Sequence, residues 1–423
     1  MLFLYNILQL IFLPLLAPLL FIISLVTPKY RGRMVNRIGL GIKSRILPPV
    51  KGQTTIWLHA LSVGEVTSAV PLAEGLRKKY SSARIVFTVS TRSGEIIARN
   101  LLTKTVDHIL PSPLDILPVV MFFYSRIKPQ IFILVETDFW PNFLLYLQYK
   151  KTPTVLVNGR VSAKSMSGYK RFPFFFRPMF DSFSCLLMQT ESDKQNMNNL
   201  GINREKIMVP GNLKFDTQIT EKSIIPLSLS KLLPGDTLVI TAGSTHQGEE
   251  DMLFTAFKRL QISHPKITLV LAPRDLDRAD QIRIVAKQHG LTTLLRSRND
   301  ETAADILLVD SIGELNFFYA MADIAFVGGS LVNEGGHNPV EPAIFGIPVL
   351  FGPYMQDFHE IAGSLVEEGG GEQVTDAADL EHALTLLMDS EDLRSQRGAA
   401  AKHYVNRQRG VVEKHLKIIQ TLL

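Results

Sequence analysis

The sequence predicts an α/β protein of two Rossmann-like, doubly wound domains that face a cleft, behind an N-terminal membrane anchor helix. Two series of short β-branched runs alternate with amphipathic stretches, which is typical of parallel sheets covered on both faces. An uncharged apolar run opens the chain, and 423 residues are too many for one compact core. We expect the anchor at 1–28, one domain at 29–215 and the other at 216–423, with a final helix that could pack back on the first domain.

The apolar run at 2–26 is long enough to cross a hydrocarbon core of about 30 Å as a helix. No basic stretch precedes it and no small-residue cleavage site follows it, so a removable signal peptide is not indicated. Seven basic residues and no acid follow between Lys29 and Lys51, which places the rest of the chain in the cytoplasm and attracts anionic headgroups. Pro14 and Pro18 would kink a spanning helix, so crossing the membrane, lying in one leaflet and folding as a buried hairpin stay open.

Bulk composition narrows the class of protein. The hydrophobic fraction of 46% and the charged fraction of 20% are those of a globular enzyme. The single cysteine, Cys185, excludes an internal disulfide and suits a reducing compartment. The net charge of +5 is modest and its excess lies near the anchor, which argues against a nucleic-acid partner.

Each series of strands and helices can be placed on the chain. The junction is expected at the polar, proline-bearing stretch 215–236, and a long helical region from Ala377 ends in an amphipathic segment. Ligands of doubly wound sheets bind at the carboxyl ends of the strands, hence in the cleft. The expected strands are 54–61, 83–91, 106–111, 130–136, 152–160 and 185–190 in the first series, and 237–244, 267–274, 292–297, 305–311, 324–330 and 348–353 in the second.

The stretch 324–353 is the most specific in the chain. An expected strand runs into a glycine pair whose missing Cβ atoms allow a sharp turn and close approach to a ligand. A second glycine pair leads to Asn338 as N-cap and Pro339 at the first helical position. Backbone N–H groups and the helix dipole there suit a nucleotide phosphate without a metal. The predicted nucleotide contacts of this run are Gly328, Gly329, Ser330, Gly336, His337 and Asn338.

Four further residues are candidates for the nucleotide site. Glu341 either binds a ribose hydroxyl or reaches back to the cap backbone as in a capping box. Ser244 lies in a similar strand-to-helix turn. Arg274 ends a strand, where its guanidinium could meet a phosphate, although a lone arginine there is more often a surface residue. Lys214 is a further candidate donor to the departing phosphate.

Two carboxylates mark the reacting end of the cleft. Glu65, the first acid of the chain, follows an expected strand and a glycine turn and lies at the start of a helix. Two roles are open for it: a general base for an acceptor hydroxyl, or a partner of the helix dipole in the first turn. Glu136 also ends a strand, and its alternative is a helix cap formed with Asp138. The segment 160–178 combines five basic residues with a phenylalanine cluster and no acid, which indicates contact with a membrane or lipid phosphate; core packing of the rings is the alternative.

The motifs HALSVGE, ETDFWPN, VNGRVS, PGNLKFD, LAPR and GGSLVNEGGHNPVEPAIFG, in this order, resemble those of the 3-deoxy-D-manno-octulosonic acid (Kdo) transferases of lipid A assembly over essentially the whole chain. The resemblance implies a GT-B glycosyltransferase fold with acceptor and CMP-sugar domains. It implies transfer of Kdo from CMP-Kdo to the lipid A precursor, lipid IVA, at the cytoplasmic face of the inner membrane. Glu65 would be the base, and Gly328 to Glu341 would hold CMP. The motif RMVNRIG at 33–39 departs from the RxG pattern of the family, which has an acid beside the first arginine.

Together these features predict an inverting transfer that needs no metal and involves CMP-Kdo, the lipid A precursor and the phospholipid surface. Glu65 would take the proton of a sugar hydroxyl as its oxygen attacks the anomeric carbon of Kdo, and Ser330, Arg274 and Lys214 would stabilise the leaving phosphate. The alternatives are another membrane-associated GT-B enzyme, such as a UDP-sugar transferase or an epimerase, and a non-catalytic, membrane-anchored nucleotide-binding protein. Release of CMP or of UDP separates the two enzymes.

Overall fold

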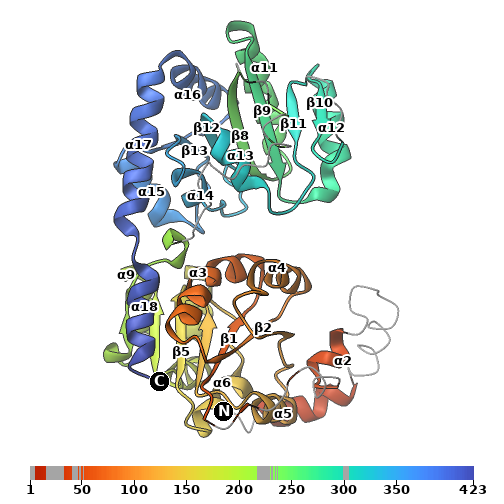
Figure 1. Cartoon of the computed structure of the whole chain (residues 1–423). Helices are drawn as coiled ribbons and strands as arrows, with labels where there is room; N and C mark the ends of the chain where they lie inside the picture. Colours follow the sequence, from red (N-terminus) through yellow and green to blue (C-terminus); the bar gives the residue numbers. More distant parts are fainter. Residues whose placement is uncertain are drawn as a thin grey trace. The chain divides into compact units, whose positions relative to one another are not determined.

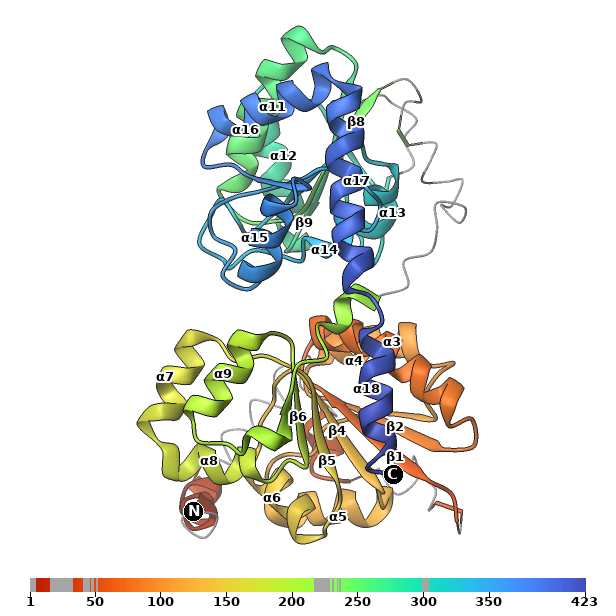
Figure 2. The ribbon, with the colours of Figure 1, turned by 90° about the vertical axis from the view of Figure 1, so that its left-hand side faces the viewer.

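The structure, a computed structural model, describes residues 5–15, 33–40, 46, 49–50, 52–216, 229, 232–233, 235, 237–298 and 304–423. The chain forms two compact units, one of Met1–Thr217 with Gly410–Leu423 and the other of Gln218–Arg409. The expected junction at 215–236 spans this division, and most of it lies outside the described residues. Each unit is a sheet with helices on its two faces (Figures 1 and 2).

The first unit is built on a parallel sheet in the order β3-β2-β1-β4-β5-β6-β7. Its central strands are buried on both faces, which accounts for their nearly continuous apolar sequences. The order reverses between β1 and β4, so the switch point at which such sheets bind ligands lies at the carboxyl ends of these two strands. The strands are β1 (Thr55–Ala60), β2 (Arg84–Val89), β3 (His108–Pro111), β4 (Ile131–Val135), β5 (Thr154–Gly159), β6 (Cys185–Met188) and β7 (Ile207–Met208).

Helices cover this sheet with two separate apolar cores. One core lies under α3, α4 and α18, and the other under α5, α6 and α8. The helices are α2 (Arg33–Arg37), α3 (Val63–Lys79), α4 (Arg92–Leu102), α5 (Leu117–Ile127), α6 (Pro141–Tyr149), α7 (Ala163–Arg171), α8 (Pro173–Asp181), α9 (Glu191–Asn199), η2 (Arg204–Lys206), η3 (Leu213–Asp216) and α18 (Val411–Gln420).

The second unit repeats this architecture with a parallel sheet in the order β10-β11-β9-β8-β12-β13-β14. Its switch point lies between β8 and β12. Its strands are β8 (Leu238–Thr245), β9 (Ile267–Pro273), β10 (Thr293–Leu295), β11 (Ile306–Leu308), β12 (Ile324–Val327), β13 (Val349–Phe351) and β14 (Gly371–Gln373). Its helices are α11 (Glu249–Ser263), η5 (Leu276–Arg278), α12 (Ala279–Gln288), α13 (Leu315–Met321), α14 (Val340–Ala343), α15 (His359–Glu367), α16 (Ala377–Asp389) and α17 (Glu391–Gln408).

The last helix, α18, returns to the first unit and lies beside α3 (Figure 2). Asp216 fixes its start, because its two carboxylate oxygens accept the N–H groups of Gly410 and Val412 at 2.8 and 2.6 Å. Gly75 permits the close packing of the two helices, since a Cβ there would lie 2.8 Å from Cδ1 of Leu416. The amphipathic pattern of the final segment thus serves the core of the first unit.

The N-terminal run is described only at 5–15, which are helical, while 1–4 and 16–32 lie outside the described residues. Within the described part of the chain, no helix is both long and apolar enough to cross a membrane. The helix at 5–15 is joined to the first unit by side chains: the Tyr5 hydroxyl donates to Asp115 at 2.9 Å, and Gln9 donates to the Asp115 carbonyl at 2.8 Å.

The strands expected from the sequence are present in both units. The edge strands β7 and β14 were not expected from the sequence, because they are too short to show a period. The phenylalanine cluster that begins in the segment 160–178 continues to Phe180 and has mixed burial. Phe172 and Phe174 are exposed, Phe175 and Phe176 are partly buried, and Phe180 lies in the core.

Candidate functional site

Glu65 lies at the switch point of the first sheet, in the first turn of α3. Glu65 is only 4% exposed. Its carboxylate reaches back to the backbone that precedes the helix, so both expected roles, general base and first-turn partner of the helix, stay predictions. One carboxylate oxygen accepts the N–H of Leu61 at 2.5 Å, and the other accepts the hydroxyl of Thr137. The carboxylate therefore bridges the turn after β1 and the turn after β4, which are the two turns that form the switch point.

The environment of Glu65 favours its protonated form. The pKa of Glu65 is raised from its ordinary value of 4.5 to about 8, chiefly by burial and in smaller part by the carboxylates of Glu136 and Asp138. The hydrogen bonds from Thr137 and Leu61 oppose this effect, because they stabilise the ionised form. A carboxylate with a pKa near the working pH is suited to accept a proton from a hydroxyl.

Glu136 does not serve as a cap of the next helix. The N-cap position of α6 is Trp140, which makes no side-chain cap. The first N–H groups of α6, those of Asn142 and Phe143, donate instead to Asp115 at 3.1 and 2.8 Å. The capping alternative for Glu136 with Asp138 is therefore wrong. Glu136 stays a predicted site residue at the carboxyl end of β4.

The turn after β4 contains unusual backbone conformations. Glu136 and Asp138 have φ of 59° and 81°, values that non-glycine residues rarely adopt. Asn158, at the end of β5, also has a positive φ, 55°, and its amide donates to Glu136 at 2.8 Å. Three adjacent strand ends thus contribute to one polar cluster.

Asp138 is the centre of a buried network that the sequence did not reveal. His59 Nε2 lies 2.8 Å from Asp138, and the Ser90 hydroxyl and Trp140 indole donate to it at 2.5 and 2.6 Å. These donors lower the pKa of Asp138 against the effect of its burial. The only sequence signal for this network was a polar residue at the end of each neighbouring apolar strand. Which of these residues pair could not be deduced, because they are many positions apart in the sequence.

Two arginines of α2 reach the same edge of the sheet. Arg33 pairs with Glu95 at 2.5 Å and donates to carbonyls at the end of β2, while Arg37 donates to the Ser112 carbonyl at 3.0 Å. Burial lowers the pKa of both arginines, and the charge of Asp138 opposes this for Arg37. These two members of the basic N-terminal cluster therefore hold the domain edge and do not project toward headgroups. The other five lie outside the described residues.

In the second unit, a buried carboxylate occupies the glycine turn predicted to bind phosphate. Glu249, at the start of α11, accepts the N–H groups of Gly329, Ser330 and Leu331 at 2.7, 2.9 and 2.9 Å, and that of His246 at 2.8 Å. The predicted direct phosphate contacts of the Gly329 and Ser330 N–H groups are thus taken by a side chain in this structure. We missed Glu249 because the contact spans about eighty residues of sequence.

Ser330 and Gly328 act within the second unit. The Ser330 hydroxyl is buried, donates to the Val327 carbonyl at 2.5 Å and accepts the Gly352 N–H at 2.7 Å. A Cβ on Gly328 would lie 2.5 Å from the Ser244 carbonyl oxygen, so the close approach expected of this glycine is made to the last residues of β8. Ser244 itself has a φ of 58°. The turn after β12 is therefore in direct contact with the end of β8.

The predicted helix start after the glycines is present but short. The helix begins one residue later than expected, because Pro339 and not Asn338 is the N-cap of α14. The Asn338 side chain still accepts the Val340 N–H at 3.2 Å, but α14 has only four residues, so its dipole is small. Glu341 accepts a hydrogen bond from the Asn338 amide at 3.2 Å. His337 Nε2 lies 2.8 Å from His246 Nε2, with the rings stacked.

The remaining predicted donors lie on different units. Arg274 follows β9, and its side chain is exposed at the carboxyl edge of the second sheet. Lys214 lies in η3 of the first unit, where its N–H donates to Asn212 at 3.0 Å. The roles of all these residues stay predictions.

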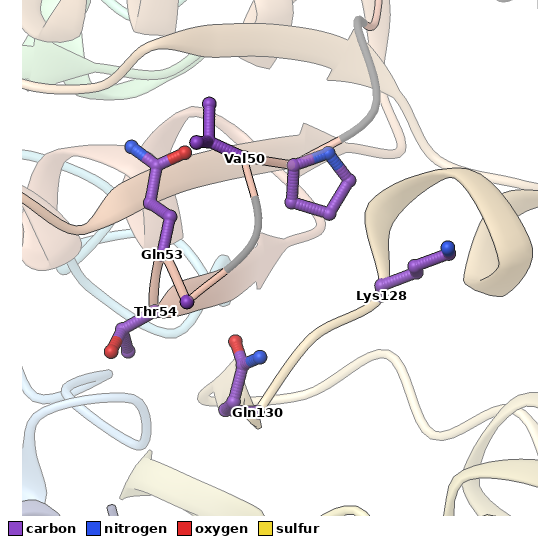
Figure 3. Close-up of a pocket in the computed structure, with 7 residues that line it drawn as sticks. Val50, Gln53, Thr54, Lys128 and Gln130 are labelled. Atoms are coloured by element: carbon purple, nitrogen blue, oxygen red, sulfur yellow. The ribbon is translucent and has the colours of Figure 1, made fainter.

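A separate hollow of about 490 Å³ lies at the opposite edge of the first sheet. Thr54 and Gln130, which immediately precede β1 and β4, line it together with Lys128 (Figure 3). Because amino ends of parallel strands meet at the edge away from their carboxyl ends, this hollow is distinct from the site around Glu65.

The fold belongs to a known structural class. A UDP-N-acetylglucosamine 2-epimerase structure has a TM-score of 0.61 at 17% identity, covering 87% of this chain and 96% of that chain. A glycosyltransferase from Rickettsia africae ESF-5 has a TM-score of 0.60 at 13% identity, covering 88% and 99%. The chain thus has the GT-B type of fold, which it shares with these two proteins.

Sequence similarity identifies the family within that class. Residues 33–217 match the family model of 3-deoxy-D-manno-octulosonic-acid transferase (kdotransferase). A 3-deoxy-D-manno-octulosonic acid transferase of Haemophilus influenzae is 33% identical over 100% of this chain and 98% of its own length, and one of Rickettsia bellii is 29% identical over 98% of both. The chain belongs to the Kdo transferase family and is a glycosyltransferase of lipopolysaccharide synthesis, which confirms the resemblance seen in the motifs.

Proposed function

We propose that the enzyme transfers Kdo from CMP-Kdo to the lipid A precursor lipid IVA, with inversion, at the cytoplasmic face of the inner membrane. The observation that carries this proposal is the placement of Glu65 at the switch point of the first sheet, with its pKa raised to about 8. Family membership supplies the class of sugar, and the site supplies a proton acceptor.

The reaction assigned to the site is one displacement. The oxygen of an acceptor hydroxyl forms a bond to the anomeric carbon of Kdo while the bond from that carbon to the CMP phosphate oxygen breaks. The hydroxyl proton passes to Glu65, whose carboxylate accepts from two donors among the described residues and so keeps lone pairs for it. Glu136, held by Asn158, is the second carboxylate at this edge and is assigned to the acceptor side.

The donor side is assigned to the carboxyl edge of the second sheet. Glu341, partly exposed and held by Asn338, is assigned to a ribose hydroxyl. His337 is also assigned to the donor side; its Nε2 lies 2.8 Å from Nε2 of His246, and the proton between these two atoms is used by the pair itself. Arg274 adds a positive charge at the same edge. The buried Glu249 keeps the two glycine turns in register and does not contact the ligand.

The direct test uses purified full-length enzyme with CMP-Kdo and tetraacylated lipid A precursor. Mass spectrometry of the lipid should show the mass of added Kdo, with an equal amount of CMP released. Glu65→Gln should lower turnover by roughly a hundredfold while CMP affinity stays near normal. Release of UDP from a UDP-sugar in place of this reaction, or binding of CMP without any turnover, would contradict the proposal and support the respective alternative.

Attachment to the membrane through residues 1–28 is the second part of the proposed function. The described helix at 5–15 places Tyr5, Asn6 and Gln9 against the first unit, where they bind Asp115 and Asn142. Its other side chains are apolar, and most are exposed, with Leu10 and Leu15 at 74% and 71%. The Tyr5 ring also contacts Phe175 of α8. Figure 2 shows the N-terminal helix beside α8.

Apolar side chains are also exposed on α8. Phe174, near the start of α8, is 67% exposed, and basic residues of α7 precede it. Exposed apolar groups accompanied by basic residues suit the interface of an anionic bilayer. Asp115 links the N-terminal helix to the site, because the same carboxylate holds Tyr5 and the start of α6.

The membrane assignment is tested by charge substitutions. Replacing Leu10, Leu15 and Phe174 by glutamate should release the protein from membranes into high salt, with activity on detergent-dispersed acceptor retained. The matched control replaces Ile262 and Ile284, which are 86% and 61% exposed on the second unit, and should leave attachment unchanged. The unmodified protein should resist high salt, because burial of apolar groups is not screened. Extraction of the unmodified protein by salt alone would overturn the assignment.

A further inference from the structure

The turn Glu136–Asp138 is short and strained. Its outer residues have φ of 59° and 81°, conformations that non-glycine residues rarely adopt and that persist only where the surrounding structure enforces them. The turn is also tied to the sheet, because the Glu136 N–H donates to the Val157 carbonyl at 2.9 Å and the Thr137 N–H to the Val135 carbonyl at 2.8 Å. A strained turn at a strand end indicates a function for the residue that it presents, and that residue is Thr137.

Both ends of the turn are held by side chains from neighbouring strands. Asn158 holds Glu136 at 2.8 Å, and His59 and Ser90 hold Asp138 at 2.8 and 2.5 Å. His59 is in turn fixed, since its Nδ1 lies 2.8 Å from the Thr88 hydroxyl of β2. An ionised carboxylate only accepts hydrogen bonds, so His59 donates to Asp138 through Nε2.

The effect of this scaffold is felt at Glu65. Thr137 donates its hydroxyl to one oxygen of Glu65, while the Leu61 N–H fixes the other. Two donors on different oxygens define both the position and the plane of the carboxylate. Without Thr137, only the contact within the turn after β1 would orient Glu65.

We propose that the Glu136–Asp138 turn is a positioning device for the catalytic base, in which Thr137 orients Glu65 and the His59–Asp138 pair holds Thr137 in place. This inference rests on the proposed role of Glu65 as base and adds positioning residues to it. His59 and Asp138 touch neither the base nor, in this assignment, the substrate. They act through the backbone of the turn.

The turn acts on the proton affinity of Glu65 in two opposed directions. Among the described residues, the charged groups that act on Glu65 are Glu136 and Asp138, which raise its pKa, while the Thr137 hydroxyl lowers it. His59 and Arg37 act on Asp138 rather than on Glu65. Removing the Thr137 hydroxyl and removing the Asp138 charge should therefore move the pKa of Glu65 in opposite directions.

The test compares pH profiles of kcat/KM. Thr137→Val, which keeps the shape and removes the donor, should move the acid limb to higher pH by about one unit, the scale of one hydrogen bond to a buried carboxylate. It should lower kcat roughly tenfold or more with KM for CMP-Kdo nearly unchanged. Thr137→Ser should restore the wild-type profile. Asp138→Asn should move the limb to lower pH.

A matched control is available on the helix that carries the base. The Thr67 hydroxyl donates to the Val63 carbonyl of its own helix at 3.0 Å, so Thr67→Val removes a hydroxyl close to Glu65 without touching it. It should leave the pH profile unchanged. Circular dichroism and CMP affinity report folding, and Thr137→Ala provides a second hydroxyl deletion if the valine does not fit.

The outcomes separate the positioning role from the base itself. A wild-type kcat and pH profile in both Thr137→Val and Thr137→Ala, with Glu65→Gln inactive, would overturn the positioning device alone. Activity retained in Glu65→Gln would instead overturn the proposed base. Equal losses in the Thr67 and Thr137 variants would show that general packing, and not the contact with Glu65, is responsible.

Discussion

The raised pKa of Glu65 makes activity and stability depend on pH in a way that Glu65→Gln should abolish. With a pKa of about 8, about one tenth of the enzyme carries the base form at pH 7 and about nine tenths at pH 9. The wild-type kcat/KM should therefore rise about tenfold between these pH values. The residual activity of the glutamine variant should show no such rise, because the group that titrates is gone.

The same carboxylate lowers stability as the pH increases. The folded protein holds the Glu65 proton more tightly than the unfolded chain, whose ordinary pKa is 4.5, so the free energy of unfolding falls as pH rises from about 4.5 to about 8. At about 1.4 kcal/mol per pH unit, the loss between pH 5 and pH 9 is about 4 kcal/mol. The glutamine variant should lack this loss, since its amide oxygen can accept from Leu61 and its NH2 can donate to the Thr137 oxygen.

Tryptophan fluorescence reports the unfolding of the first unit, which contains Glu65, and not that of the second. The chain has two tryptophans, Trp57 and Trp140, and both lie in the first unit. Urea unfolding of wild type and Glu65→Gln at pH 5 and pH 9 gives a double difference in which all other titrating groups cancel. A double difference below about 1 kcal/mol, together with a flat kcat/KM from pH 7 to pH 9, would refute a buried base with a raised pKa.

Two predictions concern the second unit. Glu341→Ala should weaken CMP binding far more than acceptor binding in calorimetry; unchanged CMP affinity with lower thermal stability would show that the contact with Asn338 is only structural. Glu249→Gln should lower the unfolding free energy of the second unit by about 2–4 kcal/mol, because one amide oxygen cannot replace a carboxylate that accepts four backbone N–H groups. The control Asp251→Asn, on the exposed side of the same helix, should change it by about 0.5 kcal/mol or less, and equal losses would contradict this reasoning.

The sequence predicted the two sheets and the strand ends that carry the candidate site residues, because the periodicity of apolar residues and the glycine turns are local signals. Glu65 and the glycine stretch were recognised in this way, and the structure places both at switch points. The partners of these residues were not recognised, because they come from other strands. Asp138 meets His59 across 79 positions, and Asp115 reaches the start of α6 across 27. Register between strands, which the sequence does not encode locally, decides such pairs.

Some local sequence patterns fit two different structural environments, and only the packing of the folded chain decides between them. The basic cluster after the apolar run contains Arg33 and Arg37, whose charges hold the edge of the first sheet. The phenylalanine segment contributes Phe180 to the core and leaves Phe174 exposed. In both cases the same composition is compatible with either environment, so the number of charges or aromatic rings does not predict which side chains are exposed.

The two units use the same position of the fold for different chemistry. Each places a buried glutamate in the first turn of the helix that follows the first strand of its sheet, Glu65 in α3 and Glu249 in α11. Burial raises the pKa of both. Glu249 accepts four backbone N–H groups and has little capacity for a further partner, whereas Glu65 accepts one N–H and one hydroxyl. The number of donors, and not burial or position, therefore distinguishes a carboxylate that locks two turns together from one that can still take a proton from a substrate.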